Sequence, residues 1–578
     1  MRLIFTEDPD ILYIATVPAE FDPKQEVTKL EDDGIFSIVR KRRRFAMNRH
    51  YRFAAAAATL LLGINATGAV AAPKHGGILR MEHRGGIASA SILEEATFST
   101  VIPFMGIFNN LVMYKQDVAQ NSVDSIVPDL ATSWAWSPDR TKLTFKLRKG
   151  VKWHDGVPFT AKDVQCTFNL IMGKSQDKLR KNPRKAWYQN VSEVVTNGDF
   201  EASFVLKRPQ PALLALLASG YSPIYPCHVS AAAMRTHPIG TGPFKFVEYK
   251  TNQSIKVVRN PDYWKKGRPY LDGIDYTIIH DVSTSVLAFI AGKYDMTFPT
   301  NLTIAEVKDL KKQDPQAVCK IEPTNVNTNL IVNRDAPPFN NPDIRKAMAL
   351  TLDRKAFVGI LYQGQADIGG AMLPPPEGIW GLTPEIYKTI PGYGSDVEKN
   401  REEARKLMEK AGYGPNNRLK IKVSTRNLPV YRDPAVILID QLKQIYIDGE
   451  LDVVETAQWF PKIARKDYTV GLNLTGNAVD DPDQAFYENY SCGSQRNYTG
   501  YCNKNLEKLF DQQSMETDKT KRQKLVWEID KQLQEDMARP VIFHARQGTC
   551  WQPYVKGVTV MVNSTYNGYR YEDVWLNK

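Results

Sequence analysis

Cysteine is scarce in this chain, with 6 residues among 578. A protein of this length, of which 43% is hydrophobic, can bury large apolar cores and does not need a disulfide scaffold as small secreted domains do. Long apolar runs are scarce too: the run at residues 53–64 is shorter than the roughly 20 residues that cross a bilayer. These absences favour a large α/β protein of two or more lobes that has no permanent membrane anchor.

Enzyme and metal motifs are also missing. The sequence has no G-x-S-x-G elbow, no P-loop and no H-E-x-x-H helix. Ser175 and Lys178 match S-x-x-K, but no S-D-N or K-T-G partner follows them. The histidines show no helical ligand pairing, and the acids of 481–483 lack the glycine and distal glutamate of a calcium loop. We therefore expect no catalytic residue, no metal site and no cofactor.

The charge balance is basic but dispersed. Lys and Arg number 75 against 64 Asp and Glu, a net charge of +11. Such a balance is compatible with nucleic-acid or membrane binding. However, bases and acids alternate closely, as in REEARK at 401–406, and no long basic tract follows residue 71. A solvated surface explains this pattern better than a nucleic-acid interface, so we expect no nucleic-acid partner.

Residues 1–71 have the features of an export signal. Arg49 and Arg52 precede the apolar run at 53–64, and an A-x-A cleavage site ends at Ala71. The first cysteine, far downstream, excludes lipid attachment at the new N-terminus. We therefore expect a periplasmic protein that is exported through a cleaved signal peptide.

Two questions about this segment stay open. Residues 1–46 would make an unusually long start, so Met47 is an alternative first residue. The competing interpretation keeps upstream sequence, because residues 42–45 resemble a twin-arginine motif, although Lys41 stands where serine or threonine is usual. Both routes lead out of the cytoplasm.

Residues 128–164 contain a strand and a helix start in one short stretch. Leu143, Phe145 and Leu147 alternate with polar residues, which predicts a strand with one buried face. Thr160 and Asp163 then form a capping box that predicts the start of a helix. A second helix start is predicted at 341–343, where NPD supplies an N-cap, a first-position proline and an acid. Its buried stripe is expected at Ile344, Ala347, Met348, Leu352 and Phe357.

The order of these features, ending in GVKWHDGVPFTAKDV, resembles the signature region of the family 5 extracytoplasmic solute-binding proteins. This family comprises the dipeptide-, oligopeptide- and nickel-binding receptors of ATP-driven importers. The blocks NPDYWKKGRPYLDGIDY at 260–276 and NLIVNRDAPPFNNPDIRKAMALTLDR at 329–354 resemble further family blocks. The resemblance implies a type II periplasmic-binding-protein fold of the cluster C kind, with two α/β lobes, a hinge and an extra subdomain.

The expected domain boundaries follow from these blocks. We predict a first lobe at 72–325 with an inserted subdomain at about 110–240, a second lobe at 326–544 and a C-terminal return at 545–578. The two crossings, near 325–335 and 540–548, would form the hinge.

The function that this resemblance implies is that of a monomeric receptor. It would capture a peptide or a peptide-sized polar solute by closing its lobes, and deliver it to the membrane permease of an ATP-driven (ABC) importer. The alternative from another class is an exported hydrolase acting on peptide or cell-wall substrates.

The candidate ligand residues come from matching motifs of the family. In peptide-binding relatives a tryptophan matching Trp459 lines the pocket, with a core tryptophan as the plain alternative. An aspartate that grips the peptide amino terminus falls here on Asn477 or Ala478, and Asp480 takes that place if the register differs. Asp481 belongs to the same acidic step. Asparagine lacks the charge that strengthens a hydrogen bond to an ammonium, so opines, sugar derivatives and metal chelates stay open as ligands.

The opposite end of a dipeptide is held by an arginine in some relatives. Arg426 and Arg432 both fall in the matching segment, and the sequence does not choose between them. An arginine fork suits a carboxylate because its paired donors meet both oxygens.

Cysteine pairing is expected at one place. Cys492 and Cys502 would close a small loop in an oxidising compartment. Cys166 and Cys227 lie in apolar surroundings and are expected to be buried thiols.

Overall fold

The computed structural model describes residues 2–4, 13–15, 72–394 and 396–578, and it divides the chain into two compact units, Met1–Val70 and Ala71–Lys578. In the first unit, β1 (Arg2–Ile4) pairs antiparallel with β2 (Tyr13–Ala15). The expected export signal at 47–71 lies outside the described residues. The second unit contains two lobes, each built around its own sheet.

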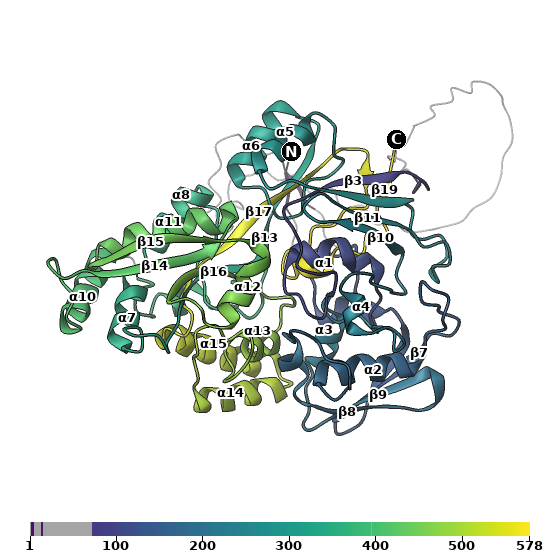
Figure 1. Cartoon of the computed structure of the whole chain (residues 1–578), viewed down its shortest axis with the longest axis horizontal. Helices are drawn as coiled ribbons and strands as arrows, with labels where there is room; N and C mark the ends of the chain where they lie inside the picture. The colour runs from purple at the N-terminus through teal and green to yellow at the C-terminus, as the bar shows by residue number, and fades with distance from the viewer. Residues whose placement is uncertain (1, 5–12, 16–71, 395) are drawn as a thin grey trace, which may run out of the picture. The chain divides into compact units, whose positions relative to one another are not determined.

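The first lobe contains a four-stranded sheet in the order β10-β11-β12-β3, in which β12 and β3 are parallel and the other pairs antiparallel. Alternate residues of these strands are buried, because one face of the sheet packs on the core near α1 (Phe98–Phe104). Figure 1 shows α1 beside this sheet. The strands are β3 (Ile78–His83), β10 (Phe244–Lys250), β11 (Ser254–Arg259) and β12 (Gly273–Ile278).

An extra subdomain in this lobe carries a second four-stranded antiparallel sheet, in the order β6-β7-β9-β8. The predicted strand is confirmed as β7, with Leu143, Phe145 and Leu147 buried. The predicted capping box is also confirmed, since Asp163 accepts from the Thr160 amide at 2.9 Å. The elements are β4 (Val112–Tyr114), β5 (Ile126–Pro128), β6 (Ala131–Trp136), β7 (Lys142–Leu147), α2 (Ala161–Met172), β8 (Val191–Thr196), β9 (Glu201–Leu206), α3 (Leu213–Ala218) and α4 (Ala231–Met234).

The second lobe is built on a five-stranded mixed sheet in the order β15-β14-β16-β13-β17. β14 (Leu419–Arg426) runs parallel to both β15 (Ile447–Val454) and β16 (Val470–Gly476), so their carboxyl ends lie at one edge. No helix in the described part of the chain is long and apolar enough to traverse a bilayer. The helices of this lobe are α7 (Pro342–Leu350), α8 (Arg354–Tyr362), α9 (Pro384–Tyr387), α10 (Val397–Lys410), α11 (Pro429–Lys443), α12 (Thr456–Ala464), α13 (Pro482–Asn489), α14 (Lys504–Met515) and α15 (Lys519–Glu535).

Two long antiparallel strands, β13 (Val318–Val332) and β17 (Val541–Trp551), connect the lobes. Their register shifts between residues 323 and 327, near the middle of the pair. One end of the pair joins the sheet of the second lobe, and the other packs against α5 (Val282–Ile290) and α6 (Ile304–Gln313). Figure 1 shows β13 and β17 running between the two lobes. Two connections of this kind allow the lobes to move about one axis.

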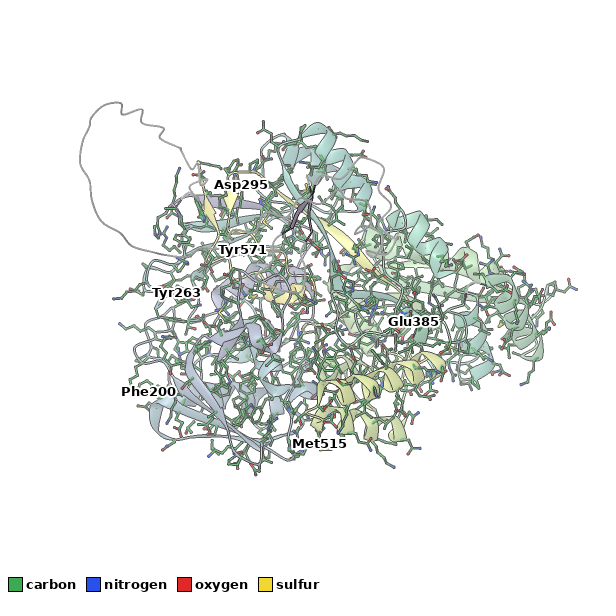
Figure 2. All side chains as sticks on the ribbon, turned by 180° about the vertical axis from the view of Figure 1, so that it is seen from behind. Phe200, Tyr263, Asp295, Glu385, Met515 and Tyr571 are labelled. Atoms are coloured by element: carbon green, nitrogen blue, oxygen red, sulfur yellow. A yellow bond between two sulfur atoms is a disulfide. The ribbon has the colours of Figure 1, made fainter. Side chains whose placement is uncertain are left out.

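The C-terminal segment returns to the first lobe. Asp295, labelled in Figure 2, has a buried carboxylate that accepts hydrogen bonds from Arg80, Tyr554 and Lys578. The last residue is thereby held next to β3, and β18 (Val555–Lys556) pairs with β19 (Trp575–Leu576).

The helix predicted at 341 starts as expected but ends earlier. Asn341 accepts from the Asp343 amide at 2.9 Å, which confirms the N-cap. The predicted stripe, however, belongs to two helices: α7 ends at Leu350, and α8 begins after Asp353. Asp353 caps the second helix by accepting from the Ala356 amide at 3.0 Å, and this local cap competes with continuation of the first.

All six cysteines form disulfides, namely Cys492–Cys502, Cys166–Cys227 and Cys319–Cys550. The first is the pair that the sequence suggested. The expectation of thiols at Cys166 and Cys227 is wrong, because α2 lies beside the loop at 227 and the two Cα atoms are 5.6 Å apart.

Asp530 on α15 makes stability depend on pH. Burial raises its pKa to about 6, although the amides of Ala371 and Met372 donate to its carboxylate. The folded pKa lies above the unfolded one, so this contribution to stability is complete below about pH 4 and is lost as the pH rises through 6. Between pH 4.5 and 7.5 the group should remove about 2 kcal/mol of unfolding free energy.

We expect Asp530→Asn to lack this loss, which urea unfolding of both proteins at the two pH values measures. The difference in unfolding free energy between variant and wild type should shift by about 2 kcal/mol in favour of the variant at the higher pH. An equal difference at both pH values would contradict the prediction.

Candidate functional site: an arginine-lined cavity between the lobes

A narrow cavity lies where residues of both lobes meet. The cavity is lined by Arg84, Ala96, Thr97, Phe98, Val326, Arg426, Val430, Tyr431, Phe460, Leu474, Gly476, Arg496, Gln547 and Tyr566.

The second lobe contributes the carboxyl ends of its parallel strands. β14 ends at Arg426 and β16 at Gly476, and both residues line the cavity. Phe460 comes from α12, the helix that follows β15. Side chains that follow the ends of neighbouring parallel strands converge at one edge of a sheet, which is where open α/β sheets bind ligands. α11 also starts here, with Val430 and Tyr431 in its first turn.

The first lobe contributes the end of β3 and the start of α1. Arg84 directly follows β3, and Phe98 is the first residue of α1. Tyr566, from the C-terminal segment, stacks on Phe98 with ring centroids 4.1 Å apart. The first-lobe wall of the cavity therefore contains aromatic rings and the guanidinium group of Arg84.

The lobes touch beside the cavity. Arg184 of the subdomain forms a buried ion pair with Glu488 of α13 at 3.0 Å. Further out, Arg208 pairs with Asp511 of α14 at 2.6 Å. The structure therefore represents a closed arrangement in which residues of both lobes surround one space.

A wider hollow adjoins the cavity and shares Ala96, Phe460 and Arg496 with it. This hollow has a volume of about 260 Å³ and contains both charge signs, with Glu94 and Glu95 near Arg180. It offers a route by which a solute can reach the cavity.

The two arginines predicted as ligand contacts differ in their location relative to the cavity. Arg426 is 2% exposed and lines the cavity, and its Nε donates to Thr456 at 3.1 Å. Arg432 lies in α11, is not among the lining residues, and donates to the side-chain oxygen of Asn427 at 3.4 Å. Of the two, only Arg426 lines the cavity.

Trp459 has the core location that was the alternative to a place in the pocket wall. It is fully buried in the core of the second lobe against Ile331, Ile463 and Tyr468, and its indole N–H donates to Asn473. Successive residues of a helix point about 100° apart, so its neighbour Phe460 faces the cavity instead.

The polar candidates after β16 have structural partners. The Asn477 amide group donates to the carbonyl of Ala371, and Asp480 accepts from the amides of Ile379 and Asn563. Asp481 is the N-cap of α13. Its carboxylate accepts two hydrogen bonds from Arg522, at 2.8 and 2.9 Å. None of the three lines the cavity. Asp481 is used within the second lobe, because a helix N-terminus and a buried guanidinium both require it. Asp480 is paired through one oxygen only, and its other oxygen is buried without a partner among the described residues.

Sequence reasoning missed Arg84 and Arg496. Arg84 stands in MEHRGG, where a charged residue directly after a strand and before two glycines was the available signal. Arg496 lies in the loop that Cys492 and Cys502 close, so the predicted disulfide restrains a cavity residue.

The sequence matches the family model described as bacterial extracellular solute-binding proteins, family 5, over residues 125–497. The chain belongs to this family. Members are binding proteins rather than enzymes, and the two lobes with a cavity between them agree with that assignment.

Curated relatives and solved structures are consistent with family 5. Di/tripeptide-binding protein 2 of Pseudomonas aeruginosa is 25% identical over 73% of this chain and 83% of its own length. Heme-binding protein A of Haemophilus influenzae is 31% identical over 57% of this chain and 60% of its own length. The structure of the periplasmic binding protein DppA of Helicobacter pylori, in complex with the peptide STSA, superposes with a TM-score of 0.77. That comparison covers 87% of this chain and 99% of DppA at 24% identity, and it shows the shared fold.

Proposed function

We propose that this family 5 protein is the periplasmic solute receptor of an ABC importer. It binds a peptide or a peptide-sized polar solute between its lobes and presents the closed form to the permease. The observation that carries the proposal is the cavity at the carboxyl ends of the parallel strands, with walls from both lobes. The names of relatives that bind dipeptides, tripeptides or haem support it.

The mechanism needs closure and no covalent chemistry. A ligand that contacts Arg84 on one lobe and Arg426 on the other makes both contacts only when the lobes meet. Such a ligand shifts the population from open to closed by its differential affinity for the two forms. We propose a hinge within β13 and β17 and lobe boundaries near residues 325 and 545.

The test combines scattering with chemical analysis of the bound solute. Small-angle scattering of the purified, exported protein should give a smaller radius of gyration after its solute is added back. The solute should bind stoichiometrically, raise the melting temperature and return unaltered. Chemical conversion of the solute would instead support the hydrolase alternative.

Gly476 offers a specific test of closure. A Cβ added at this position would lie 2.0 Å from the Tyr566 hydroxyl oxygen and 2.8 Å from two ring carbons. Because Tyr566 is stacked on Phe98, its ring cannot move away freely. Gly476→Ala should therefore hinder closure and weaken solute binding about 10-fold, as measured by calorimetry.

Gly359→Ala is the matched control, because no atom lies within 4 Å of its added Cβ. This variant should bind like the wild type. Equal affinity of the Gly476→Ala variant would show that the lobes need not approach as closely as they do here.

A further inference from the structure

Arg84 has an unusual environment for a charged residue. It is 7% exposed, and its guanidinium makes no hydrogen bond or ion pair with any residue that the structure describes. It lies over the rings of Phe298, at 4.9 Å, and Phe98, at 5.6 Å. Aromatic faces attract a cation but leave its N–H donors unsatisfied. An unpaired buried guanidinium is unfavourable, so this site is built for a partner that is not part of the chain.

Two more arginines reach the same cavity with unused donors. Arg426 uses only its Nε, and its two terminal nitrogens have no partner among residues 72–394 and 396–578. The Nη1 atom of Arg496 donates a hydrogen bond to Glu488 at 2.8 Å, while its buried Nε has no partner among the described residues. Three guanidinium groups, from both lobes, therefore line one space.

The acids nearby neutralise only part of this charge. Glu488 is shared by Arg184 and Arg496, and it also accepts from the indole of Trp187. Glu82, on the strand that precedes Arg84, accepts from the amide of Phe298. Its pKa is raised by burial, which disfavours its charged form. No carboxylate is among the residues that line the cavity.

The positive charge of Arg426 acts on the ionisation of Arg84. Burial first, and then Arg426, lower the pKa of Arg84 to about 10. The guanidinium is still charged at neutral pH, and a neighbouring positive charge disfavours it. Bringing the lobes together therefore places like charges close to one another.

Other groups in the cavity also favour a ligand with oxygen acceptors. The Gln547 amide nitrogen is buried and has no hydrogen-bond partner among the described residues. α11, a helix of 15 residues, starts at the cavity wall with Val430 and Tyr431. The positive end of its dipole adds to the arginine charge.

We infer that the cavity takes a small organic anion that carries at least two acidic groups, such as carboxylates, and no free ammonium. One acidic group would pair with Arg84 and another with Arg426 and Arg496, which would join the lobes. This inference rests on the proposed receptor function and names the class of its ligand. A peptide with a free amino terminus is disfavoured, because its ammonium would meet three guanidinium groups and no carboxylate.

The anion also explains why the receptor closes. Without it, Arg84 repels Arg426 as the lobes approach. An anion between them replaces repulsion by two attractive, charge-assisted contacts. The closed form is thus selective for acidic solutes, since a neutral or cationic solute leaves the repulsion in place.

The test is the charge of the natural ligand. Solute released by denaturing the purified protein is separated by ion chromatography, analysed by negative-ion mass spectrometry and treated with an amine-reactive dye. In parallel, thermal shifts are measured on the dialysed protein with citrate, N-acetyl-aspartyl-glutamate and alanyl-alanine. We expect a released solute of charge −2 or more negative that does not react with the dye. At least one of the two acids should stabilise the protein more than alanyl-alanine does.

Variants at Arg84 test whether affinity for an acidic solute depends on the guanidinium group of this residue. Affinity for the released acid, or for the stabilising probe, should fall about 30-fold in Arg84→Met. It should fall less in Arg84→Lys, which keeps the charge but not the fork. The melting temperature of the ligand-free Arg84→Met protein should stay the same or rise, because the residue satisfies no partner in the chain.

Three results would overturn the inference: an amine-bearing or cationic released solute, stronger stabilisation by alanyl-alanine than by both acids, or unchanged affinity in Arg84→Met. The receptor function is judged separately, by stoichiometric binding of an unaltered solute of whatever charge. An amine-bearing solute that closes the lobes would therefore overturn the ligand class and leave the receptor function supported.

Discussion

Replacing Arg426 by methionine is expected to weaken solute binding about 100-fold. The Arg426 side chain is buried at the end of β14 and presents two free nitrogens to the cavity. Loss of both would remove two charge-assisted hydrogen bonds, while methionine retains most of the apolar stem that packs near Tyr431. Isothermal titration with the solute released from the native protein measures the change.

Arg432→Met is the control for this prediction. Arg432 lies in the same segment but is not among the cavity-lining residues, so the variant should bind within about threefold of wild type. A large loss in Arg432→Met together with normal binding in Arg426→Met would show that the register of the segment in the bound form differs from the one described here.

Glu488→Gln is expected to lower the free energy of unfolding by about 3–5 kcal/mol. Burial alone would raise the pKa of Glu488, but Arg496 and Arg184 outweigh that effect and lower it, so the carboxylate is ionised. Glutamine has the same shape but leaves both guanidinium groups without a counter-charge in a site where the carboxylate is fully buried. Urea unfolding at pH 7 measures the loss. Solute affinity should fall as well, because Arg496 would lose its orientation.

A surface pair provides the comparison. Lys312 and Asp309 approach to 2.9 Å, with side chains 77% and 63% exposed. Asp309→Asn should change the unfolding free energy by less than about 0.5 kcal/mol, because water screens exposed ion pairs. Equal effects of the two substitutions would mean that the ion pairs of Glu488 with Arg184 and Arg496 contribute no more to the free energy of unfolding than an ordinary surface ion pair.

Much of the fold was predictable because the relevant signals are local. The alternation around Phe145 reflects the two faces of one strand, and the Thr160 capping box involves residues three positions apart. Where a competing local signal was overlooked, the prediction failed at that point: the cap at Asp353 divides the expected helix after 341 into two.

The candidate site was predicted less well, because a side chain's direction depends on packing. Trp459 and Phe460 are adjacent in the sequence, yet one fills the core and the other faces the cavity. Asp481 looked available for a ligand but pairs with Arg522, 41 residues away along the chain, and one oxygen of Asp480 pairs with Asn563, 83 residues away. Arg426 was one of two equal alternatives until the end of β14 placed it at the cavity.

Residue patterns alone were sufficient for the membership of family 5, the α/β class and the short-range disulfide Cys492–Cys502, since these depend on neighbours in the chain. Long-range packing was needed for the pairings Cys166–Cys227 and Cys319–Cys550, and for the meeting of Arg84, Arg426 and Arg496 around one cavity. Arg84 is separated from the other two arginines by hundreds of residues. Their shared charge, which we infer selects the ligand, arises when the closed lobes bring them together around a cavity that no carboxylate lines.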